Sequence, residues 1–184
     1  LLLSLSARAC APPCPSKPKR TDQSAPMSAW PPYPTPLTAV APAGHSDDPA
    51  TARRHFGMKP DGRGGQAATL WQRPDASASQ QIICLEAGEL FPWHRATVTV
   101  VVQPISAAPL VVTISPNGHD AAAQHVGLAW AQGQLPTLLI PAGHWWTTEP
   151  LGAHSIFTLT ATPAMTPGTI ELAPDHWRPM PRGG

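Results

Sequence analysis

The chain has 184 residues, of which 25 are proline and only 12% are charged, and its formal net charge is +1. This length suits one ordinary domain, and so much proline excludes a coiled coil or a large helical bundle. The apolar runs are far shorter than the roughly 20 residues of a membrane-crossing helix, so we expect no membrane partner. Lys and Arg are absent between Arg95 and Arg178. Because nucleic-acid surfaces need clustered cations, nucleic acid is excluded as the main partner.

Residues 1–45 form a proline-rich segment in which apolar residues show no sustained period. Such a segment buries too little apolar area to offset the entropy of ordering it, so we expect a disordered tail. Leu1–Ala7 could be the end of a secretory signal, but no basic stretch precedes it. The alternative, which we favour, is a chain that extends upstream of a true start at Met27. The three cysteines form no disulfide framework, so we expect a reducing compartment, the cytoplasm.

A short helix is expected where order begins, near residue 46. Asp47 and Asp48 are residue types that cap helix N-termini, and Pro49 suits the first turn. Gly57 can adopt the left-handed conformation that ends a helix. We therefore predict a helix over residues 50–56.

The strand signal begins near residue 67, with short runs of β-branched and apolar residues between turn residues. Ser115–Gly118 ends in the Asn-Gly pair typical of tight turns between strands. Many short strands without intervening helices indicate a sandwich or a barrel, so the predicted fold class is all-β. The expected strands are 67–72, 80–86, 97–103, 110–115, 125–130, 137–141, 145–149, 155–162 and 169–172.

Two separated motifs carry a resemblance to a known family. Gly88–Arg95 ends in Trp-His-Arg, and Pro141–Trp146 reads Pro-Ala-Gly-His-Trp-Trp. With the residues between them, these motifs resemble the cupin superfamily, and more narrowly its branch of unknown function 985 (cupin 5), over residues 46–180. The resemblance implies an RmlC-like double-stranded β-helix, a jelly-roll barrel with an open mouth, forming one domain at 46–180 after the tail at 1–45. It also implies a homodimer and a likeness to sugar-nucleotide epimerases.

The resemblance also shows which ligands of a cupin metal are missing. His94 occupies the first histidine position of the superfamily motif, but Ala96, Val100 and Trp146 stand at positions that usually carry further ligands. A bound cation needs about three or four N or O donors, so we expect no metal and no other cofactor. Three carboxyl positions of the narrower branch are also occupied by other residue types, among them Arg63.

The candidate ligand-binding residues come from the two motifs: Trp93, His94, Arg95, His144, Trp145 and Trp146. His94, expected at the barrel mouth, is also the candidate catalytic base, and Arg95 could hold an anionic group with its planar fork. Because side chains alternate along a strand, we expect one of the two adjacent tryptophans to line the cavity and the other to cover the outside. Each residue has a structural alternative: a hydrogen-bonded histidine, a packing tryptophan, or an exposed charge at a strand end.

Three functions fit these residues. The first, which we favour, is a metal-free barrel that binds a small organic ligand, with sugar nucleotides among the candidates. The second is a sugar-nucleotide epimerase or isomerase with His94 as base; it lacks an evident acid, because Tyr33, the only tyrosine, lies in the tail. The third is a degenerate structural member without a ligand. A metal-dependent cupin enzyme ranks last. We also expect a homodimer, because the low charge of residues 96–177 protects sheet edges and faces poorly.

Overall fold

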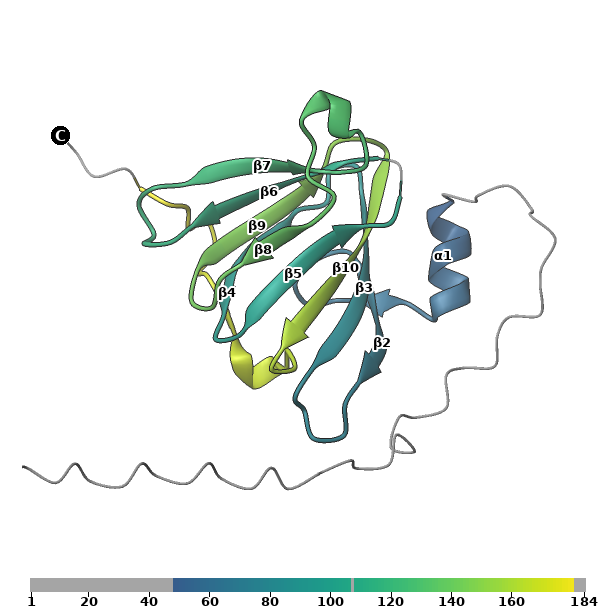
Figure 1. The fold of residues 1–184 in the computed structure, drawn as a ribbon, viewed down its shortest axis with the longest axis horizontal. Coiled ribbons are helices and arrows are strands. Elements are labelled where there is room, and N and C mark those ends of the chain that lie inside the picture. The colour runs from purple at the N-terminus through teal and green to yellow at the C-terminus, as the bar shows by residue number, and fades with distance from the viewer. Residues whose placement is uncertain (1–47, 107, 181–184) are drawn as a thin grey trace, which may run out of the picture. The chain divides into compact units, whose positions relative to one another are not determined.

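The computed structural model describes residues 48–106 and 108–180, and the predicted tail lies outside them. Two antiparallel sheets form the domain (Figure 1). Six strands follow the order β1-β2-β3-β10-β5-β8 and five follow β11-β4-β9-β6-β7. The strands are β1 (Lys59–Pro60), β2 (Gln66–Gln72), β3 (Ser79–Glu86), β4 (Phe91–Ala96), β5 (Thr99–Pro104), β6 (Leu110–Ser115), β7 (Ala122–Val126), β8 (Leu138–Ile140), β9 (Trp145–Pro150), β10 (His154–Thr162) and β11 (Ile170–Leu172). The all-β prediction is confirmed.

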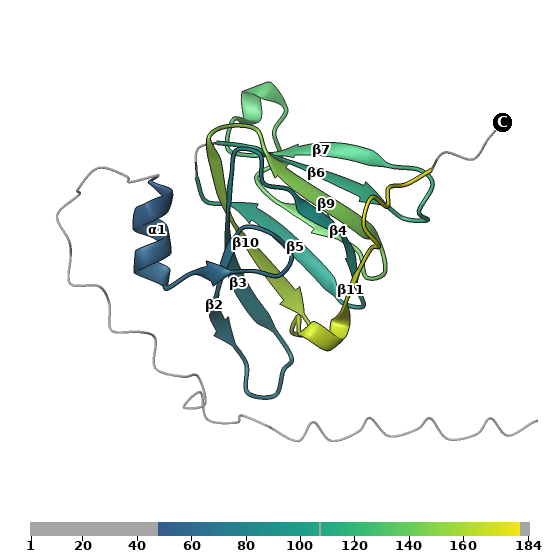
Figure 2. The same cartoon turned by 180° about the vertical axis from the view of Figure 1, so that it is seen from behind.

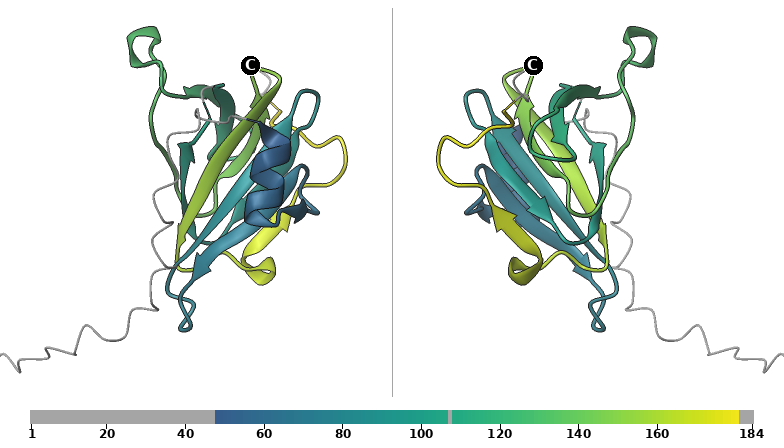
Figure 3. Two further views of the ribbon diagram at one scale, coloured as in Figure 1. Left: turned by 90° about the vertical axis from the view of Figure 1, so that its right-hand side faces the viewer. Right: turned by 90° about the vertical axis from the view of Figure 1, so that its left-hand side faces the viewer.

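The core fills the space between the two sheets. Alternate side chains of the strands point into this space because successive residues of a strand face opposite sides. Both sheets contribute fully buried aliphatic and aromatic side chains, among them Ile83, Val102, Leu110, Trp146 and Phe157. The two facing layers are visible from the side in Figure 3. Burial of these apolar surfaces is the main term that holds the sheets together.

The helix α1 (Pro49–Phe56) agrees with the prediction at both ends. The Asp48 carboxylate accepts hydrogen bonds from two backbone N–H groups of the first turn, and Gly57 ends the helix with a φ of 61°. The helix lies outside the six-stranded sheet, beside β2 and β3 (Figure 3). Ala52 packs there against a second apolar cluster that includes Cys84, a buried free thiol whose pKa is raised by burial. No helix in the described part of the chain is long and apolar enough to cross a membrane.

The strand prediction is wrong at three elements. β1 and β4 were not expected from the sequence; β4 (Phe91–Ala96) contains Pro92, and its pairing with β9 is irregular between Phe91 and His94. Proline has no N–H for the ladder and is confined to such irregular or edge positions. The strand expected at 125–130 instead covers Ala122–Val126, because pairing with β6 selects this alanine-rich stretch despite its weak strand propensity.

Candidate functional site

His94 lies on β4 and is completely buried, with 0% of its surface exposed, so the expectation of a histidine at the barrel mouth is wrong. Its Nδ1 is 2.7 Å from the carbonyl oxygen of Pro92. Because a carbonyl only accepts, Nδ1 carries the proton and the lone pair is on Nε2. Burial lowers the pKa of His94 to about 4, so the ring is neutral at pH 7.

Two aromatic rings pack against this imidazole inside the barrel. The ring centroid of His94 is 4.1 Å from that of Trp146 and 4.8 Å from that of Phe91. In the part of the chain that the structure describes, neither Nε2 of His94 nor Nε1 of Trp146 has a hydrogen-bond partner. The structure thus brings together His94 and Trp146 of the predicted residues, with an acceptor and a donor both left unpaired.

The remaining motif residues of β4 and β9 lie on the opposite, outer face of their sheet. Trp93 and Trp145 both pack against Trp177 of the C-terminal segment, with ring centroids 5.6 Å and 4.6 Å apart. Arg95 stacks on Trp145 and its Nη2 lies 2.7 Å from the carboxylate of Glu171. Figure 2 shows the C-terminal segment passing this face. The prediction that these three residues share one ligand site with His94 is therefore wrong, because strand alternation separates the two groups.

His144 belongs to neither group. It sits in the turn before β9, partly exposed, and its closest polar contact is the Ala142 carbonyl oxygen, 3.4 Å from Nδ1. The two adjacent tryptophans do face opposite sides of the sheet, as expected, and Trp145 covers the outside. Trp146 is packed in the core and does not line a cavity, so that part of the expectation is wrong.

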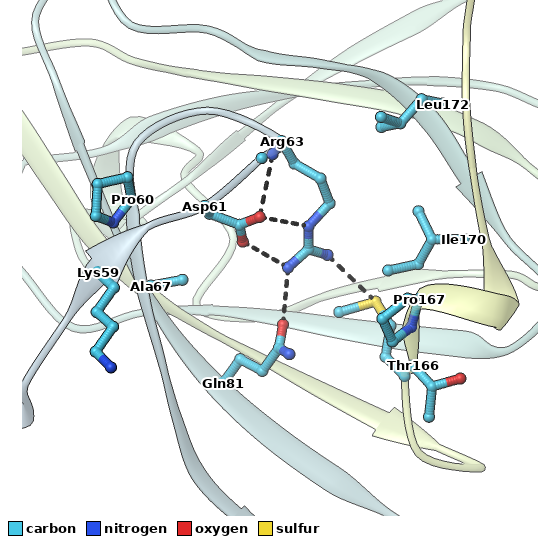
Figure 4. A pocket seen from close by; sticks show the side chains of 12 residues that line it. Lys59, Pro60, Asp61, Arg63, Ala67, Gln81, Thr166, Pro167, Ile170 and Leu172 are labelled. Atoms are coloured by element: carbon cyan, nitrogen blue, oxygen red, sulfur yellow. Dashed lines mark hydrogen bonds and ion pairs between the residues drawn. The ribbon is translucent and has the colours of Figure 1, made fainter.

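A cavity of about 470 Å³ opens elsewhere on the domain, between the β1–β2 loop, β2, β3 and the segment leading into β11 (Figure 4). Its walls are mostly apolar, and Met165, Ile170 and Leu172 contribute to them. Arg63 is the buried charged residue of this cavity, with 8% of its surface exposed. From the sequence, Arg63 was expected only as a residue that replaces a carboxyl group of the family, and not as part of a site.

Arg63 is held in a network of side chains. Its Nε and Nη2 donate to the two carboxylate oxygens of Asp61, at 3.2 Å and 2.7 Å, and Nη2 also donates to Oε1 of Gln81 at 2.9 Å. The guanidinium lies 5.0 Å from the centroid of the Phe91 ring, and this ring in turn contacts His94. The network therefore extends from the cavity wall to the buried imidazole.

The glycines after Arg63 fix the loop that presents it. Gly65 has a φ of 69°, and a Cβ there would lie 2.6 Å from the Cys84 carbonyl oxygen. Gly64 has a φ of 100°, and a Cβ there would lie 2.7 Å from the Leu90 carbonyl oxygen. Only glycine fits such a conformation at such close approach. The loop is thereby pressed against β3, which directs the Arg63 side chain toward Gln81.

The donors needed for a cupin metal do not converge. Within residues 48–106 and 108–180, no three His, Cys, Asp or Glu side chains are placed to share an ion. His94 offers one lone pair, Ala96 and Val100 offer none, and the indole of Trp146 only donates. The residues present therefore do not fit such a metal.

These observations define a class: a two-sheet jelly-roll barrel with a buried histidine and a cavity edged by an arginine. The family model of the cupin superfamily (DUF985) matches residues 53–173, and the chain belongs to this family. The double-stranded β-helix expected from the sequence is thus confirmed. The identification carries no known activity, because the function of the family is not established.

Solved structures agree with this fold. An X-ray structure of a protein from Shewanella oneidensis is similar at 18% identity and a TM-score of 0.65, over 70% of this chain and 85% of the other. A hypothetical protein from Leishmania major is similar at 11% identity and a TM-score of 0.63, over 71% of this chain and 90% of the other. Oxalate decarboxylase from Bacillus subtilis is similar at 14% identity and a TM-score of 0.50, over 62% of this chain and 29% of the other. No curated protein matches the sequence. At these identities the structures show the fold alone.

Proposed function

We propose that this protein binds a small organic molecule, without a metal, in the cavity edged by Arg63. The observation that carries the proposal is the cavity itself: about 470 Å³ of space against mostly apolar walls and one polar network. Small-molecule sites commonly have volumes of about 300–1,000 Å³, apolar linings and a few fixed polar groups. The fixed polar group here is the Asp61–Arg63–Gln81 network.

The alternative of a sugar-nucleotide epimerase with His94 as base has weaker support. Nε2 of His94 does carry a free lone pair. However, the pKa of His94 is lowered to about 4, far below the range near neutral pH in which a general base works best. The ring is also fully buried, so a substrate would need to enter the packed core. The binding proposal requires neither a base that works near neutral pH nor a substrate that enters the core.

Thermal-shift screening of the purified protein against organic acids, nucleotide sugars and metal salts tests the proposal, because a ligand of the folded state raises Tm. Ala67→Phe places a ring in the cavity, whereas Leu70→Phe changes an exposed position of the same strand outside it. We expect an organic compound to raise Tm of the wild type and of Leu70→Phe but not of Ala67→Phe. If no organic compound does so, a structural member without a ligand becomes the better interpretation.

Elemental analysis of protein purified without an affinity tag tests the metal-free part. We expect far less than one equivalent of zinc, iron, nickel or manganese per chain. A near-stoichiometric metal that is lost in His94→Ala would contradict the proposal and support a metalloenzyme.

A further inference from the structure

The charges in the cavity wall do not balance. Lys59 and Arg63 are the cationic residues that line it, and Asp61 is the anionic one. Two positive charges against one negative charge leave one net positive charge. In a wall that is otherwise mostly apolar, this excess favours a ligand of negative charge.

The guanidinium of Arg63 also has oxygen acceptors for its hydrogen bonds on one side only. Asp61 and Gln81 accept hydrogen bonds from Nε and Nη2. Within the described residues, the remaining nitrogen, Nη1, has as its only partner the sulfur of Met165, at 3.6 Å. A thioether is a weak acceptor, and Nη1 carries two N–H donors. Figure 4 shows this nitrogen turned toward the side of the cavity where Ile170 lies.

A carboxylate is the acceptor that complements such a group. Hydrogen bonds between a guanidinium and a carboxylate are shorter and stronger than bonds between neutral groups. The apolar side chains of Met165, Ile170 and Leu172, which line the same cavity, would cover an apolar ligand body. A ligand with both parts satisfies the free donor and buries the apolar wall.

We infer that the cavity takes a small organic carboxylate with an apolar body, whose carboxylate accepts hydrogen bonds from Nη1 of Arg63. The inference rests on the proposed function and specifies its ligand class. Lys59 on β1 adds attraction at the cavity edge. Asp61 places a negative charge beside the guanidinium, which repels a bound carboxylate and so limits the affinity of the ligand.

Matched probes that differ in charge but hardly in shape test this assignment: benzoate against benzamide, and hexanoate against hexanamide. Calorimetric titration of the full chain measures each Kd. We expect the carboxylates to bind roughly tenfold or more tightly than the amides, as a charge-assisted hydrogen bond requires. The affinity should fall as salt is added, since the attraction is between charges.

Three variants locate the effect. Arg63→Gln should remove the preference for the carboxylates. Asp61→Asn removes the negative charge beside the guanidinium and should tighten carboxylate binding severalfold without tightening amide binding. Arg73→Gln, which changes an exposed arginine paired with Asp75 outside the cavity, should bind like the wild type. If Arg63→Gln does not fold, Asp61→Asn still decides, because it acts on the same guanidinium.

The outcomes separate the two proposals. Equal binding of carboxylates and amides, blocked by Ala67→Phe, overturns the inference and leaves the binding function standing. Carboxylate binding that Asp61→Asn leaves unchanged places the anion elsewhere and also overturns the inference. If neither these probes nor the wider screen gives binding that Ala67→Phe blocks, the proposed function fails and the inference with it.

Discussion

Replacing His94 with Asn should make the domain less sensitive to acid. Burial holds the pKa of His94 at about 4 in the folded protein, whereas the value in an unfolded chain is near 6.5. Between these two pH values the unfolded chain binds more protons than the native state, so the free energy of unfolding decreases as pH falls from 6.5 to 4. The pKa difference of about 2.5, at 1.36 kcal/mol for each pKa unit, corresponds to a change of about 3 kcal/mol in the free energy of unfolding. Since the side chain is fully buried, solvent does not reduce this figure.

Urea denaturation at a series of pH values from 7 to 4 measures the effect. Asn suits the position because its amide can donate to the Pro92 carbonyl without titrating. We expect the stability difference between the wild type and His94→Asn to change by about 3 kcal/mol over this range, with the wild type losing more. The matched control is His125→Asn, which makes the same replacement at an exposed position on β7. Parallel loss of stability in the wild type and His94→Asn would refute the reasoning that burial keeps this ring neutral.

Four further predictions concern the loop glycines, the C-terminal segment, the tail and the oligomeric state. Gly65→Ala should lower the free energy of unfolding, measured by urea denaturation, by well over about 2 kcal/mol, because strain at positive φ adds to a clash with the Cys84 carbonyl. Gly57→Ala, which has a positive φ but open space around its Cβ, should lower it by about 1 kcal/mol. Trp177→Ala should cost about 1–3 kcal/mol, since two tryptophan contacts are lost, and should speed proteolysis of the C-terminal segment; unchanged cleavage would contradict the packing. Removal of residues 1–45 should leave Tm unchanged, and an unfolded product would disprove this boundary. Sedimentation at micromolar concentration should give a homodimer, and a monomer alone would exclude it.

Local sequence signals were reliable for the helix and for most strands. Asp48, Pro49 and Gly57 marked the ends of α1 because capping depends on residues within one turn of each other. Short runs of β-branched and apolar residues between turn residues located strands such as β6 and β10 for the same reason. Signals of this kind failed at β4 and β7, where pairing with a neighbouring strand, and not propensity, determined the boundaries.

The candidate site was predicted less completely. The Trp-His-Arg motif lies on a strand whose His94 is in the core and not at a cavity, and alternation correctly divided Trp145 from Trp146. The same alternation sends Arg95 to the outer face, where it pairs with Glu171, a residue far away in the sequence. No sequence pattern indicates that partner, so the role of Arg95 could not be assigned in advance.

The sequence alone determined most of the elements, the fold class and the family, because capping, strand propensity and motif spacing are properties of neighbouring residues. Only the tertiary structure decided which polar groups meet. Arg63 contacts Met165 across 102 positions of the chain, and His94 contacts Trp146 on a different strand. Such contacts depend on how the sheets pair and stack, which fixes burial and therefore the pKa of His94. The cavity exists for the same reason, since its walls come from segments that only the folded chain brings together.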